Sequence, residues 1–128
     1  MIDEHSVFLR KADESLTGAN SEFANGRYNN CANRCYYACF QAAIYALLEA
    51  GFRPRNAQWG HDVVQAEFVG RLLNRRKRYP AALRDTLFRN RSLRQEADYG
   101  ATDVTETQAS RALRRTREFL RAISVERG

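Results

Sequence analysis

The segment from residue 29 to residue 50 constrains the fold most, because small and apolar side chains surround it when it is drawn as a helix. With about 3.6 residues per turn, one side carries Cys31, Cys35 and Cys39. Another side carries Tyr36, Phe40, Ala43 and Leu47. A helix that is apolar on several sides must be covered by other elements. The segment therefore predicts the central helix of a bundle.

Four further segments carry apolar residues at helical spacing: 3–24, 60–75, 80–98, and one that follows Thr105 and reaches residue 123. Asn25-Gly26 and Gly51 are typical helix stops, Pro80 suits a first helical turn, and Thr105 with Gln108 has capping-box spacing. We therefore expect an all-α fold, an antiparallel up-and-down bundle of about five helices. We expect it to form a single domain, residues 1–128.

The composition excludes several classes of protein. Apolar residues make up 44% of the chain, yet no apolar run approaches the roughly 18 residues of a membrane span. The start, Met1-Ile-Asp-Glu-His5, lacks the features of a signal peptide, so we expect a cytoplasmic protein with no membrane partner. The three cysteines are predicted to be reduced and buried at a helix contact. Because only His5 and His61 could complete a zinc site, we expect neither a metal nor a cofactor.

The net charge of +6 is unevenly distributed along the chain. Residues 52–79 contain seven basic and two acidic residues, which indicates a basic surface able to meet a polyanion. The candidate nucleic-acid-binding residues are Arg75, Arg76, Lys77, Arg78 and Arg89. Such contacts would be made to phosphates and would be sensitive to salt. The alternative for the run 75–78 is a solvated helix end, where cations complement the helix dipole.

A charged cluster stands at the end of the fourth predicted helix. Arg91, Arg94 and Asp98 occupy positions i, i+3 and i+7, so they project from one face, and Tyr99 follows them. A buried charge without a partner is costly. In one interpretation Arg94 pairs with Asp98, and Arg34 of the central helix completes a buried network. In the other, the cluster is a site for RNA or a nucleotide, and Arg91, Arg94, Asp98 and Tyr99 are its candidate catalytic residues.

Three stretches of the chain resemble the HEPN superfamily. Asn33-Arg-Cys-Tyr-Tyr-Ala-Cys-Phe-Gln-Ala-Ala43 looks like the signature of its second helix, and Trp59-Gly-His-Asp-Val-Val64 is similar to the entry of its third. Leu93-Arg-Gln-Glu-Ala-Asp-Tyr99 resembles the fourth-helix motif, Arg-Gln-x-Ala-Asp-Tyr, of a subgroup of small prokaryotic HEPN proteins. The resemblance covers nearly the whole chain.

The resemblance implies a bundle that dimerises through its motif helices. Many HEPN proteins are RNases, often toxins neutralised by a partner that is commonly a nucleotidyltransferase. Their catalytic motif begins with an arginine and a polar residue, for which Arg89-Asn90 or Arg91-Ser92 would serve, and it ends with a histidine. Here that last position is Ala97 or Asp98. An aspartate with a pKa near about 3.9 is a poorer proton donor at neutral pH.

Two functions follow from these observations. We expect a homodimeric, toxin–antitoxin-like or accessory HEPN protein that acts by binding RNA or a partner protein. The alternative is an active, metal-independent endoribonuclease that uses Arg91 and Arg94 with Asp98, Tyr99 or His61. His61 would serve only if the fold brings it beside Arg94, and otherwise it is a polar residue at the start of the third helix. The resemblance also implies that Tyr99 is a site of nucleotide transfer, against the alternative that it packs under the helix end.

Overall fold

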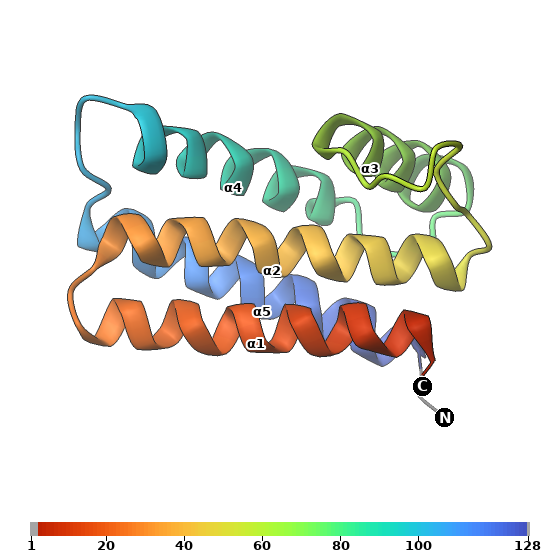
Figure 1. The fold of residues 1–128 in the computed structure, drawn as a ribbon, viewed down its shortest axis with the longest axis horizontal. Helices are drawn as coiled ribbons and strands as arrows, with labels where there is room; N and C mark the ends of the chain where they lie inside the picture. The colour runs from red at the N-terminus through yellow and green to blue at the C-terminus, as the bar shows by residue number, and fades with distance from the viewer. Residues whose placement is uncertain (1–2, 128) are drawn as a thin grey trace.

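The computed structural model describes the backbone of residues 3–127 and the side chains of residues 3–124. Its elements are α1 (Glu4–Ala24), α2 (Tyr28–Glu49), α3 (His61–Glu67), the π-helical segment η1 (Phe68–Arg75), α4 (Ala82–Tyr99) and α5 (Glu106–Arg127). The residues described include no strand, so the all-α prediction is confirmed. Figure 1 shows the four long helices lying side by side with their chain direction alternating, as in an up-and-down bundle.

The predicted central helix is α2, which lies between α1 and α4 and in front of α5 in Figure 1. Thirteen of its 22 residues are buried, more than in any other helix. Cys31, Cys35 and Cys39 are among them and carry free thiols, as expected. Small side chains allow neighbouring backbones to approach closely, so the cysteines and alanines of α2 set the spacing of the bundle.

The helix ends follow the sequence signals with one shift. Gly26 and Gly51 have φ angles of +73° and +88°, which favour glycine. Thr105 and Gln108 form the predicted capping box, since each side chain accepts a hydrogen bond from the other residue's backbone N–H. The fourth helix was expected to start at Pro80 but begins at Ala82, because a tight turn in which the Leu83 N–H donates to the Pro80 carbonyl precedes it.

The predicted third helix, 60–75, is α-helical only in its first half. From Phe68 onward it is π-helical, and the Arg76 N–H donates to the carbonyl of Arg71, five residues earlier, at 3.1 Å. The wider turn places Phe68 and Leu73, which are also five residues apart, together in the core. Burial of these two side chains gives a physical reason for the departure from α-helical geometry.

A buried polar link joins α2, α4 and α5. The Nδ2 amide of Asn90 donates to Thr116 Oγ1 at 2.9 Å and to Cys39 Sγ at 3.4 Å. The Oδ1 atom of Asn90 accepts from Nε and Nη2 of Arg115 at 3.3 and 2.9 Å. Buried polar groups are stable only when they are hydrogen-bonded, so this network fixes the register of the three helices.

Within residues 3–127, no helix combines the length and apolar character needed to cross a membrane.

Replacing Asn90 with alanine should lower the free energy of unfolding by roughly 2 kcal/mol, because the substitution removes the acceptor of two Arg115 N–H groups and the donor to the buried Thr116 Oγ1. Urea unfolding followed by circular dichroism measures the change. Ser92→Ala, at an exposed position of the same helix, is the control and should change stability by less than about 0.5 kcal/mol. Equal stability of the two variants would show that the Asn90 network does not hold the bundle together.

Candidate functional site

The predicted face of α4 carries Arg91, Arg94 and Asp98, and the last two form an ion pair. Nε of Arg94 lies 3.1 Å from Oδ2 of Asp98, and Asn33 Nδ2 donates to the same oxygen at 3.1 Å. Asn33 Oδ1 in turn accepts from Nη2 of Arg34 at 2.6 Å. Arg34 therefore joins the network only through Asn33 of α2, which forms hydrogen bonds with both Arg34 and Asp98.

The expectation that this network is buried is wrong at its outer end. The side chain of Arg94 is 15% exposed, but that of Asp98 is 25% exposed and Arg34 lies at the surface. The physical reason is position, since Asp98 belongs to the last turn of α4, where the helix reaches the end of the bundle. The Nε of Arg94 that faces Asp98 is itself buried and makes no hydrogen bond with the residues that the structure describes, so the two side chains are joined by charge alone at this atom.

The fold brings His61 beside these arginines. It is the first residue of α3, as its alternative interpretation predicted, and its Nδ1 lies 2.6 Å from the hydroxyl of Tyr36 on α2. Burial lowers the pKa of His61, and the positive charges of Arg94 and Arg91 lower it further, while Asp62 opposes them. His61 is therefore neutral at pH 7 and lies within the electrostatic field of both arginines.

The tyrosine pair of α2 forms the floor beneath these charges. The guanidinium of Arg94 lies 5.6 Å from the ring centre of Tyr36 and 5.5 Å from that of Tyr37, within cation–π range. The guanidinium of Arg34 lies 5.4 Å from the ring centre of Tyr37, which is also within cation–π range. Burial is the main cause that raises the pKa of Tyr36 to about 12, so its hydroxyl stays protonated and can position the His61 ring.

Arg91 occupies the side of the cluster that faces α3. Its Nη2 lies 2.8 Å from Oδ1 of Asp62, and its Nη1 donates to Gln65 Oε1 at 3.2 Å. The Asp62 side chain is 90% exposed, and an ion pair to so exposed a partner is worth only about 0–1 kcal/mol. A groove of about 700 Å³ opens beside Arg91 between α3–η1 and α4, with Phe88 and Arg84 also in its lining.

Arg91, Arg94 and His61 are called the arginine–histidine site below. Counting Arg34, three cations face two carboxylates, Asp62 and Asp98, so the cluster keeps a net positive charge while His61 is neutral. Guanidinium groups present N–H pairs that match the oxygens of a phosphate. The arrangement can therefore bind an anion, and it places a neutral imidazole next to that anion.

The other predicted residues do not join this site. Asn74, just before the basic run 75–78, contacts Arg84 near the start of α4. Ten residues of helix, about 15 Å, separate Arg84 from Arg94, so the run lies toward the other end of α4. Arg89 lies on the opposite side of α4, in a groove against α5. Tyr99 is 79% exposed, so the alternative in which it packs under the helix end is wrong.

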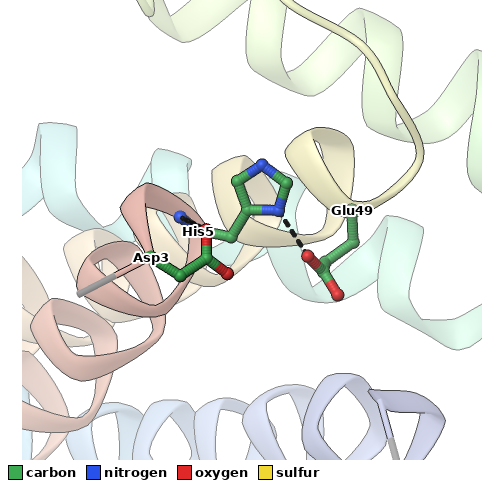
Figure 2. A group of neighbouring side chains, drawn as sticks. All are labelled: Asp3, His5 and Glu49. Carbon is green, nitrogen blue, oxygen red and sulfur yellow. Dashed lines mark hydrogen bonds and ion pairs between the residues drawn. The ribbon is translucent and has the colours of Figure 1, made fainter. Parts of the chain in front are cut away.

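One group of metal-ligand side chains comes together in the part of the chain that the structure describes. Ligand atoms of Asp3, His5 and Glu49 lie within 4.8 Å of one another (Figure 2). Asp3 caps α1 by accepting from the backbone N–H of His5 at 3.2 Å, and Nδ1 of His5 contacts Oε2 of Glu49. These contacts tie the start of α1 to the end of α2 and account for all three side chains. A divalent cation would have to replace them.

Sequence reasoning named His61 only on the condition that the fold brings it beside Arg94, and it missed the tyrosine floor beneath the two residues. His61 and Arg94 are 33 positions apart, and no local pattern reports a contact between α3 and α4. The one usable signal was the histidine in the third-helix entry, directly after a loop.

Comparison with known proteins agrees with this architecture. The HEPN domain family matches residues 5–127. A UPF0332 protein from Archaeoglobus fulgidus is 40% identical over 50 residues, which are 39% of this chain and 40% of that protein. The matched segment thus spans less than half the length of that relative. Because the family match covers nearly all of the sequence, the chain belongs to the HEPN domain family.

Proposed function

We propose that this HEPN protein binds RNA through the arginine–histidine site and works as a toxin–antitoxin-like or accessory component in the cytoplasm. The observation that carries the proposal is the convergence of Arg91, Arg94 and His61 from α3 and α4 over the tyrosines of α2. A phosphodiester offers the charge and the paired oxygens that two guanidinium groups recognise.

The partners of the two arginines make such binding feasible. The ion pair of Arg91 with Asp62 is exposed, so a phosphate can displace that carboxylate without uncovering a buried charge, while Arg94 keeps its ion pair with Asp98. The net charge of +6 adds long-range attraction for a polyanion. An acidic partner protein would meet the same charges, but it would not need His61.

A second candidate function, RNA cleavage, is favoured by the position and the lowered pKa of His61. In the tautomer whose Nδ1–H donates to the Tyr36 hydroxyl, Nε2 carries the lone pair that can accept the 2′-hydroxyl proton. The 2′-oxygen then bonds to the adjacent phosphorus, the bond from phosphorus to the 5′-oxygen breaks, and that oxygen takes up the proton. Arg91 and Arg94 would stabilise the charge on the phosphoryl oxygens. The products are a 2′,3′-cyclic phosphate and a 5′-hydroxyl.

The proposal includes a homodimer through α4 and the end of α2. Phe88 on α4 is 62% exposed and lines the same groove as Ala66 and Val69, and contiguous exposed apolar surface is typical of interfaces. Light scattering at micromolar concentration should give the mass of two chains, and Phe88→Ser should shift it toward one. A wild-type mass of one chain at that concentration would contradict the dimer.

We also propose that a nucleotidyltransferase partner modifies Tyr99, in the Arg-Gln-x-Ala-Asp-Tyr segment. The Tyr99 side chain is exposed and therefore accessible to an enzyme. An added nucleotide would place a phosphate near Arg91 and Arg94. Intact-mass spectrometry after co-expression with a neighbouring nucleotidyltransferase gene should show the mass of a nucleotide monophosphate. The addition should be absent from Tyr99→Phe and present in the control Tyr28→Phe. An unchanged wild-type mass would contradict the proposal.

Replacing Arg91 and Arg94 with glutamine should weaken binding of a fluorescent single-stranded RNA by roughly tenfold for each arginine. The slope of log affinity against log salt should fall by about 1.4, since two phosphate contacts are lost. Fluorescence anisotropy at several salt concentrations measures both quantities. The control is Arg10→Gln, which removes a charge from exposed α1. If the double variant binds RNA as tightly as the control, the proposed site is wrong.

If the protein cleaves RNA, His61→Gln should abolish cleavage and leave RNA affinity within about threefold, because the neutral ring contributes no charge. The wild-type rate should rise with pH through a pKa below the ordinary 6.5 or so, as the imidazole loses its proton. Gel analysis of labelled RNA with detection of the cyclic phosphate measures the rate, and His5→Gln is the control. Undiminished cleavage by His61→Gln would exclude this mechanism. If the wild type does not cleave RNA, RNA binding without cleavage remains as the proposed function.

A further inference from the structure

Three arginines line a second groove, on the side of α4 that faces α5. Arg89 comes from α4, and Arg111 and Arg115 come from α5; the groove between them has a volume of about 330 Å³. Arg89 precedes Arg91 by two positions, which is about 200° around a helix. This α4/α5 groove and the arginine–histidine site therefore lie on opposite sides of the same helix.

Arg115 is held rigidly in this groove. Its Nε and Nη2 donate to the buried Oδ1 of Asn90, whose own amide is fixed by Thr116. Within the described residues, the Nη1 amino group of Arg115 donates to no acceptor. One edge of the guanidinium is thus anchored in the core, and another is available to a ligand.

The positive charges of the groove are not neutralised within the molecule. None of its three arginines forms an ion pair with a residue that the structure describes. One carboxylate, that of Glu96, lines the groove, and its Oε1 already accepts a hydrogen bond from Thr102 at 2.7 Å. Burial lowers the pKa of Arg115, and the nearby charges of Arg89 and Arg111 lower it further. Like charges are therefore held together at a cost that an anion would relieve.

We propose that the α4/α5 groove is a second anion site, and that it binds a phosphate group. Three guanidinium groups from two helices can surround a tetrahedral anion that has several oxygens, and their charge exceeds that of Glu96 by two. Ser92 and Gln108 also line the groove. Because Gln108 Oε1 accepts from the Thr105 N–H at 2.9 Å, its amide N–H groups are what it can offer to a ligand.

The phosphate can come from an RNA backbone or from a free phosphate compound. An RNA strand that crosses α4 would meet the arginine–histidine site on one side and the α4/α5 groove on the other. The helix between them is about 10 Å across with its side chains, a distance that a few nucleotides can span. A free phosphate compound would occupy the groove independently of Arg91 and Arg94.

The test uses the full chain with Arg89→Gln and Arg111→Gln together. Both side chains are exposed and hold no hydrogen bond within the described residues, so the fold should be unaffected. The matched control is Arg114→Gln with Arg121→Gln, which removes two exposed charges of α5 outside the groove. Isothermal titration with inorganic phosphate and with pyrophosphate, and anisotropy with single-stranded RNA, are measured for both variants and for the wild type.

Wild type and control should bind pyrophosphate, and the groove variant should bind it at least tenfold more weakly. A parallel loss of RNA affinity, with a salt slope lower by about 1.4, would identify the RNA backbone as the source. Unchanged RNA affinity would identify a free phosphate compound. Arg91→Gln with Arg94→Gln should retain pyrophosphate binding at the groove, so failure of the first site is distinguishable from failure of the second. Equal pyrophosphate affinity of the groove variant and the control would overturn the proposal.

Discussion

Close packing around α2 is the constraint on which the rest of the structure depends. Cysteines and alanines along its buried sides bring α1, α4 and α5 near enough for the Asn90 network to join three helices. Midway along α2, Tyr36 and Tyr37 contact residues of α3 and α4. There the side chains of α3 and α4 meet over the tyrosine rings instead of over apolar residues. The position of the arginine–histidine site thus depends on this tyrosine pair midway along α2.

The positive charges on the two sides of α4 differ in how they are compensated. Toward α3, Arg91 and Arg94 have carboxylate partners, of which Asp62 is exposed and readily exchanged and Asp98 is only partly exposed. Toward α5, Arg115 is held by a neutral, buried Asn90 and is surrounded by other arginines. Both arrangements hold a guanidinium in place without fully neutralising it. An anion that binds on either side would replace weak internal partners or relieve repulsion between like charges.

Much of the fold could be predicted because its signals are local. Helical periodicity located α1, α2 and α4 to within two residues, whereas α5 continues four residues beyond its predicted end at residue 123; the Thr105–Gln108 capping box and Gly26 specified their own geometry. The π-helical turn could not be predicted, because it reflects burial of Phe68 and Leu73 against distant helices. The candidate site could be predicted only in part, because some of its contacts are local and others join different helices. Spacing on one helix placed Arg94 and Asp98 together, whereas the approach of His61 and the relay through Asn33 depend on contacts between helices.

The central claim is that Arg91, Arg94 and His61 act on one bound anion, and the titration of His61 reports on it directly. NMR of the histidine side chains would follow its pKa in the wild type, in Arg91→Gln with Arg94→Gln, and in the presence of single-stranded RNA. The pKa should lie below the ordinary 6.5 or so in the free wild type, because the ring is partly buried beside two cations. It should rise when the arginines are removed, and it should rise when RNA supplies a negative charge. A pKa that stays the same in all three samples would contradict a shared site.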